Sequence, residues 1–145
     1  MAQASLPEGA LNLAVPNSLQ GLKMGLDTLG EWLTRAQLGQ EVENRAFLVF
    51  EEIVTNIIRY GFDDSLAHEI KVAVLLKSAE LTLTFDDDGR PFDPRCAPHP
   101  EPHRSLEKAP IGGRGLLLVR KLAKHLGYER TPNGRNRLTV GVPLL

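Results

Sequence analysis

The stretch FDDDGRPFDP (Phe85–Pro94) places three consecutive carboxylates, Asp86, Asp87 and Asp88, directly after an alternating apolar run. Adjacent carboxylates repel one another, so such a cluster is tolerated best where water, a cation or a ligand takes up the charge. Because Asp-Gly is also common turn chemistry, a solvated turn explains these ten residues as well. The rest of the chain has to decide between a turn and a ligand site.

A second candidate group lies in EEIVTN, where Glu52 and Asn56 are four residues apart and therefore share one face of a helix. An amide oxygen suits a hard cation, and a carboxylate one turn away can orient or deprotonate a nucleophile. Mg²⁺ fits these residues better than zinc, because no set of cysteines or histidines stands nearby. A solvated glutamate and an ordinary helical pair remain the alternative.

The third candidate is GGRG (Gly112–Gly115), which directly precedes a helix predicted over Leu116–His125. Glycines let the backbone approach a ligand, and the first N–H groups of a helix favour an anion such as phosphate. A flexible hinge is an equally simple interpretation. The spacing matches neither the P-loop nor the dinucleotide-binding pattern.

The elements that must position these groups follow from periodicity and turn signals. In chain order they are a strand at Leu11–Val15, a helix capped by Asn17 or Ser18 and ending near Ala36, a helix over Gln40–Tyr60 ended by Gly61, a hairpin of Glu69–Leu76 and Glu80–Phe85, the helix Leu116–His125, and a second hairpin of Tyr128–Thr131 and Asn136–Val142. This order predicts an α+β fold, a two-layer sandwich with helices on one face of a mixed, mainly antiparallel sheet.

Length and composition indicate one globular domain spanning 1–145, with 1–10 expected to be flexible. A formal net charge of −1 argues against binding nucleic acid through bulk positive charge. The single cysteine and the absence of a leader pattern or long apolar run predict a soluble, cytoplasmic protein. The leucine stripe from Leu19 to Leu33 is expected to be core or a homodimer seam.

Taken together, EEIVTN, DDDGRP, GGRG and the late glycine Gly134 resemble, in order and spacing, the motifs of the GHKL (Bergerat-fold, histidine-kinase-like) ATP-binding domains. The resemblance is strongest to the small anti-sigma-factor serine/threonine kinases of bacterial partner switching. It runs from about Leu11 to Pro143 and implies ATP and Mg²⁺ as cofactors.

On that resemblance, EEIVTN is the N box, with Glu52 as catalytic base and Asn56 as magnesium ligand. DDDGRP is the G1 box, in which Asp87 accepts a hydrogen bond from the adenine amino group and Gly89 leaves room for the purine. Asp86 and Asp88 are then expected to flank the site in water.

GGRG is similar to the G2 box, where Gly113 and Gly115 give the backbone room around the phosphates. Arg114, inside this loop, is expected to meet phosphate charge. The proline-rich segment 93–112 is expected to act as the ATP lid, since a structureless loop of roughly 20 residues is uncommon in a compact domain.

Four positions depart from the family pattern. Pro91 stands where a second glycine is usual, Arg135 and Asn136 replace threonines that commonly follow the late glycine, and Tyr60 stands where histidine is frequent. Pro91 stiffens the turn, and the changes after Gly134 bear on the adenine contacts.

Two functions are consistent with these features. One is a kinase that phosphorylates a small STAS-type anti-sigma antagonist, with a sigma factor as the second partner. The other is a nucleotide-gated module that binds a sigma factor or another regulator without significant phosphoryl transfer. The chain has no room for the dimerising phosphoacceptor domain of a histidine kinase proper.

Two further patterns favour ordinary roles. Cys96, His99 and His103 offer three possible metal ligands but suggest no fourth, so they are interpreted as lid residues. A nucleic-acid patch is disfavoured because no aromatic residues interleave with the basic residues of the third helix region, which are Arg114, Arg120, Lys121 and Lys124.

Overall fold

The computed structural model describes residues 9–93 and 111–144, with side chains described for 9–93 and 115–144. The elements in chain order are β1 (Gly9–Pro16), α1 (Leu19–Ala36), α2 (Gln40–Tyr60), β2 (Glu69–Lys77), β3 (Glu80–Asp87), α3 (Ile111–Leu122), β4 (His125–Arg130) and β5 (Asn136–Pro143). Most of the expected lid, together with Cys96, His99 and His103, lies outside these residues.

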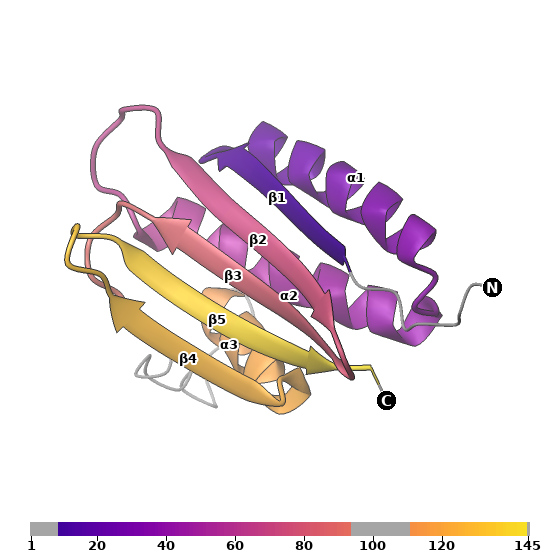
Figure 1. The fold of residues 1–145 in the computed structure, drawn as a ribbon. Coiled ribbons are helices and arrows are strands. Elements are labelled where there is room, and N and C mark those ends of the chain that lie inside the picture. The colour runs from indigo at the N-terminus through magenta and orange to yellow at the C-terminus, as the bar shows by residue number, and fades with distance from the viewer. Residues whose placement is uncertain (1–8, 94–110, 145) are drawn as a thin grey trace.

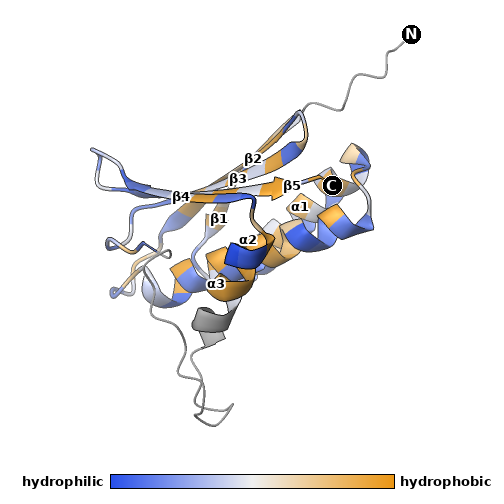
Figure 2. Cartoon of the chain, turned by 90° about the horizontal axis from the view of Figure 1, so that it is seen from below, coloured by the Kyte–Doolittle hydropathy of each residue, from blue (hydrophilic) through white to orange (hydrophobic). Residues whose placement is uncertain are grey.

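The five strands form one sheet in the order β1-β2-β3-β5-β4, and every pairing in it is antiparallel. The helices lie on one face of this sheet, and the edge-on view separates the two layers (Figures 1 and 2). The predicted α+β sandwich is therefore confirmed, although the described strands contain no parallel pair of the kind that a mixed sheet would have. None of the helices in the described part of the chain is long and apolar enough to cross a bilayer.

Helix α1 begins and ends where the leucine spacing predicts. Of the two expected caps, Ser18 serves: its Oγ accepts a hydrogen bond from Gly21 N at 3.0 Å. A Cβ on Gly21 would lie 2.1 Å from the carbonyl oxygen of Pro16, so the glycine allows the helix to pack directly on the end of β1. The C-terminal part of the leucine stripe is core, whereas Leu19 at its start is 70% exposed.

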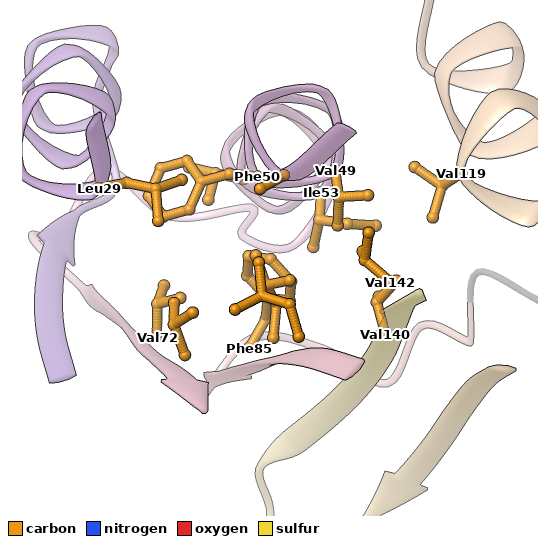
Figure 3. Packing of buried hydrophobic residues seen from close by; sticks show 14 of the residues in the cluster. Leu29, Val49, Phe50, Ile53, Val72, Phe85, Val119, Val140 and Val142 are labelled. Carbon is orange, nitrogen blue, oxygen red and sulfur yellow. The ribbon is translucent and has the colours of Figure 1, made fainter. Parts of the chain in front are cut away.

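The core lies between the sheet and the three helices (Figure 3). Phe50 of α2 meets Phe85 of β3 with ring centroids 6.1 Å apart, a tilted aromatic pair at the centre of the layer. Side chains from all three helices and from β2, β3 and β5 join them, among them Leu29, Val49, Ile53, Val72, Val119, Val140 and Val142. This apolar layer holds α2 rigidly against β3 and β5.

The largest differences from the predicted boundaries concern the starts of β1, α3 and β4 and the end of α3. Strand β1 begins at Gly9, within the segment expected to be flexible, because Gly9 and Ala10 continue its register with β2. Helix α3 spans Ile111–Leu122, so the GGRG glycines lie in its first turn and do not precede it. It ends before His125 because Lys124 N already donates to Gly141 O of β5 at 2.7 Å, which starts β4 early.

Candidate functional site

The C-terminal end of α2, the end of β3, the end of β4 and the start of β5 meet at one edge of the sandwich (Figure 1). Asn56 of EEIVTN and Asp87 of DDDGRP meet there, and Leu116, the residue that follows GGRG, joins them. Residues of α2, β3, β4, β5 and α3 line one small cavity of about 30 Å³, namely Ile53, Asn56, Ile57, Gly61, Asp87, Phe92, Leu116, Tyr128, Asn136 and Leu138. Its walls are mostly apolar, with a few converging polar groups, which is the usual composition of a ligand site.

Asn56 is the polar group that α2 contributes to this cavity. Its side chain is buried, and Nδ2 donates to the backbone oxygen of Glu52 at 2.7 Å. No donor to Oδ1 is found among the described residues. The helix therefore fixes the amide with a neutral oxygen left as acceptor, the type of ligand that Mg²⁺ takes.

Asp87 is the only carboxylate among the residues that line the cavity. It is 4% exposed, and Oδ1 accepts hydrogen bonds from Gly89 N at 2.8 Å and Asn136 Nδ2 at 3.1 Å. Burial raises the pKa of Asp87, and these two hydrogen bonds oppose the rise. The arrangement supplies a buried acceptor at the apolar end of the site.

The turn after β3 is docked on the end of α2. Arg90 N donates to Gly61 O at 2.9 Å, and Arg90 Nε donates to Tyr60 O at 2.7 Å. A Cβ on Gly89 would lie 2.3 Å from Gly61 O. The close contact with Gly61 therefore explains why position 89 is glycine. The room for a purine that the sequence analysis assigns to Gly89 stays a prediction.

Asn136 connects this turn to the far side of the sheet. Its Oδ1 accepts from Tyr128 Oη and from Arg130 Nη1, and its Nδ2 donates to Arg90 O at 2.8 Å as well as to Asp87. Arg130 Nη1 also donates to Gly89 O at 2.8 Å. Sequence reasoning noted Asn136 only as a departure and missed Tyr128 and Arg130; the register Asp87↔Asn136 between β3 and β5 is the signal that links them.

Glu52 faces α3 and is not among the residues that line the cavity. A Cβ on Gly115 would lie 1.7 Å from Glu52 Oε2, so the glycine gives the carboxylate the space it occupies. Burial, and secondly the charge of Glu51, raise the pKa of Glu52, while Arg59 lowers it. The surroundings of Gly113 and the side chain of Arg114 lie outside the described part, so their phosphate contacts stay predictions.

The outer two aspartates of the DDD cluster are not simply solvated, contrary to the sequence-based expectation. Asp86 is paired with Arg135 and with Arg137, whose Nη2 lies 3.2 Å from Asp86 Oδ2, and its side chain is 14% exposed. The reason is the sheet register, which sets Arg137 opposite Asp86. Arg135, one of the departures from the family pattern, therefore balances this carboxylate.

Asp88 is bound from the other side by His68, which precedes β2. The His68 ring stacks on Phe62 with centroids 4.1 Å apart, and its nitrogens lie 2.8 Å from Asp64 Oδ1 and 3.2 Å from Asp88 Oδ1. The hydrogen bond with Asp64 raises the pKa of His68, partial burial lowers it, and the charges of Asp64 and Asp88 raise it further. A protonated ring donates to both carboxylates and ties the α2–β2 loop to the turn after β3.

No group of three or more metal-ligating His, Cys, Asp or Glu side chains occurs in the described ranges. The C-x2-H-x3-H pattern lies outside these ranges. The side chain of Arg114, a member of the basic set, lies outside the described side chains as well. Among the residues that line the cavity, the neutral Oδ1 of Asn56 is the group that matches the magnesium ligand expected from the sequence.

The sequence matches the model of the histidine kinase-like ATPase domain over residues 15–141. The chain belongs to this family. It is 33% identical over 93 residues to the serine/threonine-protein kinase BtrW of Bordetella bronchiseptica, an alignment that covers 64% of this chain and 65% of BtrW. The match thus spans less than two thirds of that relative's length.

Two solved structures share the fold. One contains the RsbU and RsbW domains of a Mycobacterium tuberculosis protein, with a TM-score of 0.64 at 14% identity, covering 94% of this chain and 33% of that one. The other is the SiaB–SiaC complex of Pseudomonas aeruginosa, with a TM-score of 0.57 at 17% identity, covering 91% and 88%. Both confirm the ATP-binding fold that the motifs predicted.

We expect Gly115→Ala to displace the Glu52 carboxylate, because the new methyl group takes the place of Oε2. The displaced carboxylate gains water, so the pKa of Glu52 falls toward its ordinary value. Helix propensity favours alanine by up to about 1 kcal/mol, so overall stability stays near that of the parent protein. Carboxyl ¹³C NMR titration measures the pKa, and Gly127→Ala, whose Cβ meets nothing within 4 Å, is the control. An unchanged Glu52 titration in Gly115→Ala would contradict the contact.

The contacts of His68 with Asp64 and Asp88, here called the His68 clamp, predict that the free energy of unfolding depends on pH. Because the folded-state pKa of His68 is raised, its contribution is fully present below the unfolded value of about 6.5 and is lost as pH rises through the folded value. The free energy of unfolding should therefore fall over this window in the parent protein and fall less in His68→Gln. Urea titrations at a series of pH values measure both slopes. Identical slopes would show that the clamp contributes nothing.

Proposed function

We propose that this chain is an ATP-dependent serine/threonine protein kinase of a partner switch, which phosphorylates a small STAS-type anti-sigma antagonist and also binds a sigma factor. The observation that carries the proposal is the meeting of Asn56 and Asp87 at one cavity, with Glu52 one helical turn away from Asn56. Membership of the ATPase family supports the nucleotide, and the name of the curated relative supports protein phosphorylation.

In this proposal the adenine base enters between α2 and β5. The carboxylate of Asp87 accepts a hydrogen bond from the exocyclic amino group of the base, and apolar side chains such as Ile53 and Leu138 cover the ring. A cavity of about 30 Å³ holds one or two water molecules but not a purine. The residues around the cavity must therefore move apart when the nucleotide binds, as they do in enzymes with mobile lids.

The phosphates then extend toward the first turn of α3, where backbone N–H groups favour an anion and Arg114 supplies a positive charge. Asn56 would be the protein ligand of Mg²⁺ through Oδ1, since Nδ2 is already donating to the helix backbone. When bound, the ion neutralises charge on the β- and γ-phosphates. The described residues supply one such ligand, and Mg²⁺ commonly keeps several waters besides.

Glu52 is the proposed general base. Its raised pKa moves it toward the neutral range in which a carboxylate can accept a proton from a serine or threonine hydroxyl. The acceptor oxygen forms a bond to the γ-phosphorus, the bond from that phosphorus to the β,γ-bridging oxygen breaks, and the hydroxyl proton passes to Glu52. ADP leaves, and the phosphorylated protein carries the group.

A regulator-binding module without phosphoryl transfer is the second candidate, and one observation favours it. Glu52 is packed against Gly115 and does not line the cavity. If nucleotide binding leaves that contact intact, the carboxylate does not reach an acceptor. The SiaB–SiaC complex shows that a domain of this fold can hold a protein partner, and a homodimer is a further possible assembly of this chain.

Glu52→Ala and Asn56→Ala separate the two functions. We expect Asn56→Ala to lose Mg²⁺-dependent ATP affinity, and Glu52→Ala to retain ATP binding while transfer falls by about 10²–10⁴-fold, the usual contribution of a general base. Glu41→Ala, which removes an exposed carboxylate from the first turn of the same helix, is the control and should retain transfer.

The assay combines the protein, Mg²⁺ and γ-labelled ATP with antagonist proteins encoded near it, and calorimetry follows ATP binding. Transfer by Glu52→Ala at the parent rate would remove Glu52 as the base. ATP-dependent binding of a sigma factor by a parent protein that labels no antagonist would exclude the kinase and leave the binding module.

A further inference from the structure

The side chain of Asn136 uses all of its hydrogen-bonding capacity inside the protein. It is 5% exposed, and its two amide hydrogens are directed at Asp87 Oδ1 (Nδ2 to Oδ1, 3.1 Å) and Arg90 O (2.8 Å). Its Oδ1 accepts from Tyr128 Oη and from Arg130 Nη1 at 3.1 Å. Acceptors surround the nitrogen and donors surround the oxygen, so the network fixes the orientation of the amide.

The two oxygens of Asp87 are consequently in different situations. Oδ1 accepts from Gly89 N and from Asn136 Nδ2, whereas no described residue donates to Oδ2. Asp87 lines the cavity, and within residues 9–93 and 115–144 every fully enclosed side-chain oxygen has a hydrogen-bond partner. Oδ2 is therefore the oxygen that remains for a molecule in the cavity.

Of the two donors to Oδ1, Asn136 is the one that belongs to another strand. Gly89 N donates from the turn that follows Asp87, two residues along the chain. Asn136 donates from β5 and is held in turn by Tyr128 and Arg130 of β4. Among the described side chains, Asn136 thus fixes the carboxylate relative to β5 and β4.

We infer that Asn136 is a positioning residue, which holds Asp87 so that Oδ2 alone faces the cavity and reads the amino group of the nucleobase. Asn136 itself has no donor or acceptor left for the base. The inference rests on the proposed binding of ATP at Asp87, and it adds a basis for selecting adenine. An ionised carboxylate accepts from a 6-amino group but repels the 6-oxo group of inosine triphosphate, whereas a protonated carboxyl can donate to that oxygen.

Removing the hydrogen bond from Asn136 should raise the pKa of Asp87, an effect that a general loss of stability does not produce. A hydrogen bond to the ionised form of a carboxyl group lowers its pKa, and burial, the larger effect at Asp87, raises it. Without Asn136 the pKa of Asp87 rises further, because the substitution leaves in place the Gly89 hydrogen bond and the charge of Arg135, which lower it, and the charge of Asp86, which raises it. ATP affinity, which requires the ionised form, is then lost at a higher pH as the solution is acidified.

The test uses the nucleotide-free protein first. Carboxyl ¹³C NMR of Asp87 should show a titration midpoint about one pH unit or more higher in Asn136→Ala than in the parent, the size expected for a hydrogen bond to a charged group. Asn136→Leu, which keeps the volume but has no polar atom, should show the same shift and provides a second variant if one folds poorly. Thr139→Ala, which removes a polar side chain from β5 outside the cavity, should keep the parent midpoint. An unshifted midpoint in folded Asn136 variants would overturn the inference.

Nucleotide affinities then test the binding half separately. In Asn136→Ala, the midpoint at which ATP affinity falls on acidification should move with the Asp87 titration, and the preference for ATP over inosine triphosphate near that midpoint should shrink at least tenfold. A uniform loss of ATP affinity at every pH, with the preference unchanged, would overturn the positioning role. If the Asp87 titration shifts and ATP affinity does not change, Asp87 does not contact the nucleobase. That result would overturn both the inference and the proposed function.

Discussion

The docking of the turn after β3 onto the C-terminal end of α2 is the contact on which the rest of the site depends. Gly61 O accepts from Arg90 N, and Gly89 lies so close to Gly61 that no side chain fits between them. Because α2 is a continuous helix, this contact sets the distance between Asn56 and the end of β3. One backbone contact therefore joins the N-box and G1-box motifs, which are about thirty residues apart in the sequence.

Three consecutive carboxylates lie at this edge of the sheet, and each of them has different partners. Asp86 is neutralised by Arg135 and Arg137, and Asp88 lies beside His68. Asp87, in the middle, is buried and has only neutral hydrogen-bond donors. The charge of Arg135 offsets only part of the cost of burying this carboxylate, and a fold retains such a group most readily where a ligand uses it.

The sequence predicted the fold class and both long helices because leucine spacing, caps and strand alternation are local signals. The start of α3 could not be predicted in this way, since glycine has low helix propensity and the contact of Gly115 with Glu52 joins two helices that are far apart in the sequence. Likewise, alignment of the motifs identified Asp87, whereas Tyr128 and Arg130, which bond to its partner Asn136, come from β4 and depend on a strand register that no local pattern states. The features that sequence reasoning missed are therefore those that depend on contacts between distant segments of the chain.

The central claim, that Asp87 reads the adenine amino group, is tested most directly by calorimetric titration of ATP into the parent protein and Asp87→Asn in the presence of Mg²⁺. Asparagine keeps the shape of the side chain but removes the charge of the acceptor. The account predicts a loss of about 1.5–3 kcal/mol in binding free energy, roughly 10- to 150-fold in affinity, whereas Asp88→Asn retains the parent value. Equal ATP affinity in the parent and in a folded Asp87→Asn variant would contradict it.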